Sequence, residues 1–238
     1  MRKVLIASGD SWTDPDYIAH SHPDMDCSWL KWPEILAEKL DMDCINLGSS
    51  GAGNKYIFNS LVDQIQLMEP DDIGYVMAGW SQAPRVDVKV RDMWRSVDPY
   101  PMDPAYSTQI IDRRGDVTHW VQESILRFYS LQEICKSKNI PLLQVQMIPL
   151  YGGYNWNLIK QSRDNADSTT DATLLQTIND SIYIDKIEDN FVGWPTESDL
   201  GGINIQMDVI DEHIISELDI HPNEKGQIQI AEYLYDKI

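Results

Sequence analysis

Cysteine, basic residues and long apolar runs are scarce in this chain of 238 residues, and each scarcity excludes a class of protein. Cys27, Cys44 and Cys135 are odd in number and match no close-spaced ligand pattern, so we expect reduced thiols rather than a disulfide framework. Lys and Arg number 19 against 38 Asp and Glu, and the formal charge of −19 would repel phosphate backbones and anionic lipid surfaces. Nucleic acid is therefore not an expected partner.

The chain also lacks the apolar segments of a membrane or exported protein. No apolar run reaches the roughly 18 residues of a membrane span. The first residues lead directly into a predicted strand, without the longer apolar core or the small-residue cleavage site of a signal peptide. We therefore expect a cytoplasmic protein with no membrane insertion. Its length suits a single α/β domain over residues 1–238.

Strand-like and helix-like segments alternate along the chain. Four apolar runs predict strands, at Val4–Ala7, Cys44–Leu47, Ile73–Ala78 and Pro141–Ile148. Four amphipathic segments predict helices, at Ser28–Leu40, Tyr56–Met68, Val121–Lys136 and Pro222–Ile238. This order is typical of a doubly wound, mostly parallel sheet, so the expected fold is a three-layer α/β/α sandwich of the flavodoxin-like type.

Two segments break the alternation, and both follow predicted strands. The segment at about 81–115 is rich in Pro, Asp, Arg, Trp and Tyr, and the segment at about 150–170 is rich in Gly, Asn, Asp, Ser and Thr. Long loops in a compact domain are usually functional or disordered. We predict that both are loop insertions that form the walls of a substrate pocket, and surface insertions without a function are the alternative.

Two short motifs at opposite ends of the chain contain the chemically informative residues. Gly9-Asp10-Ser11 follows the first predicted strand, and a tight turn at the glycine would expose Ser11 at the edge where open α/β sheets bind ligands. Asp219 and His221 are one residue apart, so in an extended segment both side chains project to the same side and the carboxylate can fix the imidazole tautomer. The pattern predicts a serine nucleophile, a histidine base and an orienting aspartate, with a turn serine and a helix-end histidine as the structural alternatives. Asp10 is interpreted as a structural turn residue.

In their order and strand context these motifs resemble the SGNH hydrolases, the superfamily of GDSL-like esterases and lipases. Gly9-Asp10-Ser11 matches the first block of that family, which supplies the nucleophile. Gly51 matches the glycine of the second block. Asp219 and His221 resemble the last block, although the commonest spacing in the family has two intervening residues and this chain has one.

The third block departs from the family pattern. Ser81 stands where the family places an asparagine, and a hydroxyl is a shorter and more freely rotating donor than an amide. The resemblance implies an oxyanion hole made by the backbone N–H groups of Ser11 and Gly51 together with the Ser81 hydroxyl. Gln82 or Asn54 offers a substitute amide.

The function implied by the resemblance is that of a serine esterase, which forms an acyl-enzyme and hydrolyses a small acyl ester without a metal or an organic cofactor. The polar and aromatic loops favour O-acetyl groups on a carbohydrate as the substrate. The candidate substrate-binding residues are Trp80, Gln82, Arg85 and Asn54. The alternative is a non-catalytic glycan-binding or structural protein that retains the fold with a degraded oxyanion site, which Ser81 and the short Asp-x-His spacing favour.

Three further patterns compete with this interpretation. Gly48-Ser49-Ser50-Gly51-Ala52 lies between a predicted strand and a helix and is nearly a nucleophile elbow, which makes Ser50 a rival nucleophile. The same glycines resemble a phosphate cradle, but their spacing misses both the Walker and the dinucleotide patterns. The third pattern is a set of possible metal ligands that lie close together in one polar loop. Their spacing matches no recognised metal site, so we predict none from His20, His22, Asp24, Asp26 and Cys27.

Overall fold

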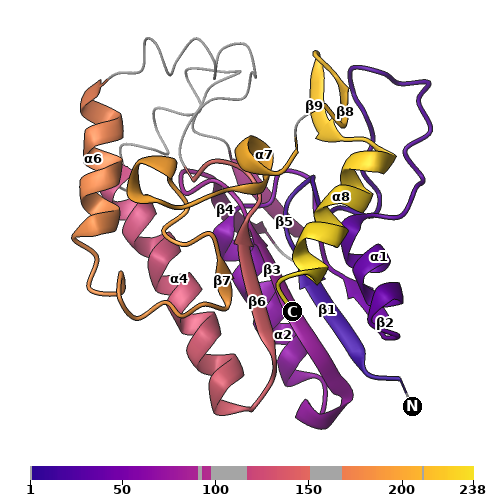
Figure 1. Ribbon diagram of the computed structural model, residues 1–238, viewed down its shortest axis with the longest axis horizontal. Helices are drawn as coiled ribbons and strands as arrows, with labels where there is room; N and C mark the ends of the chain where they lie inside the picture. Colours follow the sequence, from indigo (N-terminus) through magenta and orange to yellow (C-terminus); the bar gives the residue numbers. More distant parts are fainter. Residues whose placement is uncertain (1, 91–92, 98–116, 151–167, 211) are drawn as a thin grey trace.

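A five-stranded parallel sheet forms the centre of the molecule (Figure 1). The computed structural model describes residues 2–90, 93–97, 117–150, 168–210 and 212–238. The strands lie in the order β2 (Asp43–Asn46), β1 (Val4–Ser8), β3 (Ile73–Trp80), β6 (Leu142–Gln146) and β7 (Phe191–Val192). Read along the chain, this is the second, first, third, fourth and fifth strand of the sheet, which is the flavodoxin-like order. The predicted fold class is confirmed.

Helices cover both faces of this sheet, as the buried side chains of β1 show. Leu5 and Ala7 pack with α1 (Trp32–Lys39) and α8 (Glu224–Tyr235). Ile6, between them, points to the opposite face and packs with α2 (Asn54–Gln66) and α4 (Val117–Ser137). Because successive side chains of a strand alternate between faces and both faces are covered, the strand is apolar from Val4 to Ala7.

The helix α1 is shorter than the sequence predicted. It begins at Trp32 rather than at Ser28, since the preceding residues form a loop fixed by a lysine. The ammonium group of Lys31 donates to the carbonyl oxygens of Cys27 and Trp29, at 2.6 and 2.8 Å. These carbonyls are therefore satisfied outside a helix, although the apolar spacing of the segment is helical.

The first predicted loop insertion contains a β-hairpin. β4 (Val86–Val90) pairs antiparallel with β5 (Met93–Val97), so part of the segment at 81–115 is regular structure, while residues 98–116 lie outside the described chain. The carboxylate of Asp87 is buried and accepts from the backbone N–H groups of Gly53 and Tyr56, at 2.9 and 2.8 Å. This contact caps the N-terminus of α2, which has no side-chain cap of its own.

The second predicted insertion, at about 150–170, falls almost entirely on residues 151–167, which are outside the described chain. The helix α6 (Ser168–Asn179) begins within its last residues. The described residues also include short helical segments: η1 (Pro70–Asp72) before β3, and η2 (Ser198–Leu200) and α7 (Ile205–Asp208) after β7.

A separate antiparallel hairpin precedes the last helix. β8 (Ile214–Ser216) pairs with β9 (Asp219–Pro222), and neither strand joins the central sheet. Pro222, predicted as the first residue of the final helix, is instead the last residue of β9. Asn223 caps α8, because its side chain accepts from the N–H of Gly226 at 3.1 Å.

Within the described part of the chain, every helix is too short or too polar to span a bilayer.

Trp80 provides a test of the core. Its side chain is fully buried, its ring lies 4.7 Å from that of Phe128, and its indole N–H donates to Gln144. We expect Trp80→Ala to lower the free energy of unfolding by about 3–5 kcal/mol, because it leaves a large cavity. Urea denaturation measures this change. In the control Leu67→Ala, at a side chain that is 79% exposed, the change stays within about 0.5 kcal/mol. Equal changes in the two variants would contradict this packing.

Candidate active site

The turn after β1 presents Ser11 at the C-terminal edge of the sheet. The carbonyl oxygen of Asp10 accepts from the N–H groups of Thr13 and Asp14, at 2.9 and 3.0 Å, which folds the chain back on itself. A Cβ atom at Gly9 would lie 2.1 Å from Oγ1 of Thr13, so a side chain at this position does not fit. The glycine is therefore required by close packing inside the turn.

Ser11, His221 and Asp219 lie in one hydrogen-bonded row. Nε2 of His221 is 2.8 Å from Oγ of Ser11, and Nδ1 of His221 is 2.6 Å from Oδ1 of Asp219. Asp219 and His221 alternate along β9, so both side chains point to the same side. The structure thus brings together the three residues that the sequence singled out as a nucleophile, a base and an orienting carboxylate.

The surroundings of Asp219 favour its ionised form. Burial raises the pKa of this carboxyl group, but the hydrogen bonds and charge of His221 and the hydroxyl of Tyr17 lower it by more, so the pKa lies below its ordinary value. The backbone N–H of His221 also donates to Oδ1, at 3.2 Å. Asp219 is therefore a negative partner for an imidazolium ion at His221.

Tyr17 is a member of this cluster that the sequence analysis missed. Its hydroxyl donates to the carboxylate of Asp219, with distances of 3.0 Å to Oδ1 and 2.9 Å to Oδ2, and lies 2.7 Å from Nδ1 of His221. The Tyr17 and His221 rings are 4.3 Å apart at an angle of 32°. Tyr17 is one of 11 tyrosines and stands in a polar loop, so no local pattern marks it.

The turn after β1 that presents Ser11 is called the nucleophile turn below. The loop after β2 lies beside it. The N–H of Ser49 donates to the carbonyl oxygen of Gly9 at 3.0 Å, and Ala52 closes a turn back to Ser49. Gly51 has a φ of +78°, which favours glycine at this position. Within the described part of the chain, the backbone N–H groups of Ser11 and Gly51 donate to no protein acceptor.

The Ser81 hydroxyl points into a buried polar network. Its side chain is fully buried, and its hydroxyl donates to Oδ2 of Asp10 at 2.9 Å. Nη1 of Arg85 donates to Oγ of Ser81 at 2.8 Å. This differs from the expected oxyanion role, because the one hydroxyl proton is directed to Asp10 beneath the nucleophile turn.

Arg85 also belongs to this network. Its Nη1 is 3.1 Å from Oδ2 of Asp10 and 3.2 Å from the carbonyl oxygen of Ala52. The side chains of Arg85 and Asp10 are 7% and 0% exposed. Arg85, a candidate substrate-binding residue, thus pairs through Nη1 with a carboxylate of the chain itself. Asp10, whose Oδ1 accepts from the N–H of Trp12, is the structural turn residue that the sequence indicated.

The other predicted substrate-binding residues are buried. Trp80 is part of the hydrophobic core beside Phe128, so its predicted contact with substrate is wrong. Gln82 and Asn54 are 3% and 2% exposed. Asn54 accepts from the N–H of Ser81 at 2.8 Å, and this contact joins the first turn of α2 to the end of β3.

Ser50, the rival nucleophile, contacts a carboxylate instead of a histidine. Its hydroxyl and its backbone N–H both donate to Oδ2 of Asp14, at 2.5 and 2.7 Å. Among the described residues it has no histidine within hydrogen-bond distance. This arrangement holds the loop after β2 against the turn after β1 and does not supply a base that would take the Ser50 proton.

The cysteines and the loop with His20 and His22 were the candidates for a disulfide or a metal site. Cys27, Cys44 and Cys135 are free thiols, and burial raises the pKa of both Cys44 and Cys135 to about 12, with Glu34 adding to the shift at Cys44. Among the residues that the structure describes, no group of three or more His, Cys, Asp and Glu side chains is arranged to hold a metal ion.

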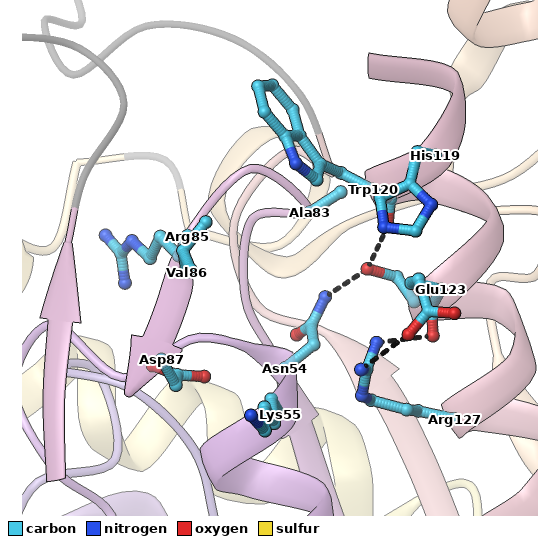
Figure 2. A pocket seen from close by; sticks show the side chains of 11 residues that line it. Asn54, Lys55, Ala83, Arg85, Val86, Asp87, His119, Trp120, Glu123 and Arg127 are labelled. Carbon is cyan, nitrogen blue, oxygen red and sulfur yellow. Dashed lines mark hydrogen bonds and ion pairs between the residues drawn. The ribbon is translucent and has the colours of Figure 1, made fainter. Parts of the chain in front are cut away.

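A cavity of about 570 Å³ adjoins the buried network on the face of the sheet that carries α2 and α4 (Figure 2). Its volume is in the range of small-molecule sites. Its wall combines polar, charged and aromatic side chains, among them Asn54, Lys55, Arg85, Trp120, Glu123 and Arg127. Glu123 and Arg127 form an ion pair at 2.8 Å.

The buried ion pair makes a second testable prediction. Arg85→Met leaves the buried carboxylate of Asp10 without its cation, and we expect a loss of about 3–5 kcal/mol in the free energy of unfolding. Arg2 forms an ion pair with Asp41 in which the side chains are 59% and 79% exposed. Arg2→Met is therefore a matched control, with an expected change below about 1 kcal/mol. Urea denaturation of both variants measures these free energies of unfolding. A loss in Arg85→Met no greater than that in Arg2→Met would refute the structural role of the buried pair.

Several solved structures are similar to this chain at low sequence identity. A protein of the G-D-S-L lipolytic family from Desulfitobacterium hafniense DCB-2 is 13% identical, with a TM-score of 0.52 and 99% of each chain covered. The psychrotrophic esterase EstA from Pseudoalteromonas sp. is 14% identical, with a TM-score of 0.47 and coverage of 99% of this chain and 96% of that chain. The acetylxylan esterase Axe2 from Geobacillus stearothermophilus is 14% identical, with a TM-score of 0.45 and coverage of 99% and 93%. No family model and no curated protein sequence matches the chain. The Desulfitobacterium protein shares the fold of this chain over nearly its full length.

Proposed function

We propose that this protein is a serine esterase that hydrolyses a small acyl ester, with Ser11 as nucleophile, His221 as general base and acid, and Asp219 as the orienting carboxylate. The observation that carries the proposal is the hydrogen-bonded row from Ser11 through His221 to Asp219, with distances of 2.8 and 2.6 Å. A nucleophile, a base and an orienting group within hydrogen-bond reach are the geometric requirement for acyl transfer to serine.

The reaction follows from these contacts. As Oγ of Ser11 attacks the ester carbonyl carbon, Nε2 of His221 takes the hydroxyl proton, and Asp219 stabilises the resulting imidazolium. When the tetrahedral intermediate collapses, the imidazolium gives its proton to the departing alcohol and an acyl-enzyme remains. A water molecule then loses a proton to His221 and attacks the acyl carbon, which releases the acid and restores Ser11. No step needs a cofactor.

The oxyanion hole of this proposal consists of two backbone donors. The N–H groups of Ser11 and Gly51 lack protein acceptors among the described residues, and the contact of Ser49 with Gly9 holds their two loops together. The Ser81 hydroxyl is excluded from this role by its bond to Asp10. Since the loss of one oxyanion donor costs about 3 kcal/mol of transition-state stabilisation in other enzymes, we expect slower turnover than with an additional amide donor.

The position of the row in the sheet supports an active site. Ser11 follows β1, which lies between β2 and β3 in the sheet, and the order of strands in the sheet reverses at this point. Open α/β sheets bind ligands at such a reversal, outside the carboxyl ends of the strands. The shared fold of the G-D-S-L family protein is consistent with the same reaction class.

As substrate we favour an O-acetyl group on a carbohydrate. The cavity that Arg85 lines, beside the buried network under the nucleophile turn, combines the aromatic ring of Trp120 with polar groups such as Asn54, and sugars are bound by aromatic faces and hydrogen bonds in this way. The predicted pocket loops lie outside the described residues, so this preference rests on the cavity. A non-catalytic glycan-binding protein is the alternative, and the contact of 2.8 Å between Ser11 and His221 favours the enzyme.

The nucleophile is tested by comparing two serines. We expect Ser11→Ala to lower kcat on p-nitrophenyl acetate by roughly 10⁴-fold or more, because no other side chain in the row can form the acyl-enzyme. Ser50→Ala serves as the control and retains turnover within about threefold. Among the described residues, the hydrogen-bond partner of the Ser50 hydroxyl is Asp14 and not the His221 ring. Loss of activity in Ser50→Ala but not in Ser11→Ala would assign the nucleophile to Ser50 instead.

The acyl specificity is tested with a series of p-nitrophenyl esters. Because Ala83, Val86 and Trp120 are the apolar side chains in the cavity wall and offer little room for a long acyl chain, we expect kcat/KM to be highest for acetyl and to fall by about tenfold or more at octanoyl. Acetate release from a fully acetylated oligosaccharide, followed by an enzyme-coupled assay, then tests the carbohydrate. Faster hydrolysis of octanoyl than of acetyl esters would reject the small-acyl substrate while leaving the nucleophile intact.

A further inference from the structure

The hydroxyl of Tyr17 contacts both members of the His221–Asp219 pair, and its ring lies against the imidazole. We propose that Tyr17 is a positioning residue that fixes the Asp219 carboxylate and, through it, the tautomer and orientation of His221. The inference rests on the proposed function and deepens it, because it adds a fourth residue to the row without giving it contact with the substrate.

Hydrogen-bond geometry determines where the protons lie. The Tyr17 hydroxyl has one proton, which it donates to the acceptor-only carboxylate of Asp219, 2.9 Å away at Oδ2. A lone pair of the same oxygen then faces Nδ1 of His221 at 2.7 Å, beside Oδ1 of Asp219 at 2.6 Å. Two oxygen acceptors thus surround Nδ1 and hold a proton there. Nε2 is left with its lone pair directed at Ser11, which is the tautomer that a general base requires.

The hairpin that carries the pair needs such a contact. β8 and β9 form a two-stranded sheet of their own, so the hydrogen bonds of the central sheet do not set their distance from the nucleophile turn. The segment that follows this turn holds the hairpin at two further points. Oγ of Ser21 donates to the carbonyl oxygen of Leu218 at 3.3 Å, and Nε2 of His22 lies 2.7 Å from Oγ of Ser216. Tyr17 is the contact of this segment that reaches the reactive side chains.

The charges around Tyr17 keep its hydroxyl protonated. Burial, and then the adjacent Asp219 carboxylate, raise the pKa of Tyr17 above its ordinary value. The titratable groups that face it are Cys27 from its own segment and Asp219 and His221 from β9. A neutral donor withdraws charge from the carboxylate. Tyr17 therefore remains a neutral hydrogen-bond donor to Asp219 at neutral pH.

Tyr17→Phe tests the proposal because it removes one oxygen and keeps the ring. We expect kcat to fall by about tenfold with KM unchanged, since the base loses its fixed tautomer while the substrate loses no contact. Tyr56→Phe is the matched control, since Tyr56 is also half-buried and its hydroxyl donates to the carbonyl oxygen of Leu47 at 2.9 Å. We expect kcat and KM of Tyr56→Phe to equal those of the wild type.

A readout that needs no turnover separates this proposal from the proposed function. Nitrogen-15 NMR of histidine-labelled protein, with His221→Ala to assign the signal, reports which ring nitrogen is protonated in the neutral imidazole. We expect Nδ1–H in the wild type and a mixture of tautomers in Tyr17→Phe. If the wild type hydrolyses no ester, or Ser11→Ala remains active, the proposed function fails and the tautomer measurement still decides on Tyr17. An unchanged tautomer and an unchanged kcat in a folded Tyr17→Phe variant would overturn the positioning role.

Discussion

The buried carboxylate of Asp10 is the constraint on which the geometry of the site depends. Oδ1 accepts from the backbone of its own turn, and Oδ2 accepts from Ser81 and Arg85, which follow β3. The same guanidinium reaches the carbonyl oxygen of Ala52, in the loop after β2. One fully buried charge therefore ties together the ends of three adjacent parallel strands. A buried charge is tolerated only when it is paired and hydrogen-bonded, so the position of Ser11 is coupled to the integrity of the whole network.

The site is assembled from two parts that the central sheet does not align by itself. The nucleophile turn and the loop containing Gly51 belong to the sheet, whereas Asp219 and His221 belong to a separate hairpin. The last helix, α8, packs with α1 and so holds the base of that hairpin near the turn. Contacts from the segment after the turn, with Tyr17 at their centre, then determine the final placement of the imidazole. This division explains how residues more than two hundred positions apart approach to 2.8 Å.

Local patterns predicted what depends on local periodicity. The apolar run of β1 and the alternation of Asp219 and His221 gave the strand, the nucleophile turn and the orientation of the pair in β9. Side-chain roles that depend on tertiary contacts were not predictable in this way. Ser81 occupies the expected position after β3, but its hydroxyl is directed by a buried partner that no spacing reveals. Tyr17 reaches the pair from a loop without any motif. In the hairpin β4–β5 the alternating valines of Val86–Val90 were a usable signal, masked by the loop-like composition around them.

The most direct test of the account is covalent trapping of the nucleophile. A fluorophosphonate phosphonylates a serine hydroxyl, with loss of fluoride, only when a nearby base activates the hydroxyl. Peptide mapping by mass spectrometry locates the adduct. We expect a single adduct on Ser11 of the wild type, no adduct on Ser11 of His221→Ala, and no adduct on Ser50 of either protein. An adduct on Ser50, or an unmodified and correctly folded wild-type protein after prolonged exposure, would contradict the claim that His221 activates Ser11.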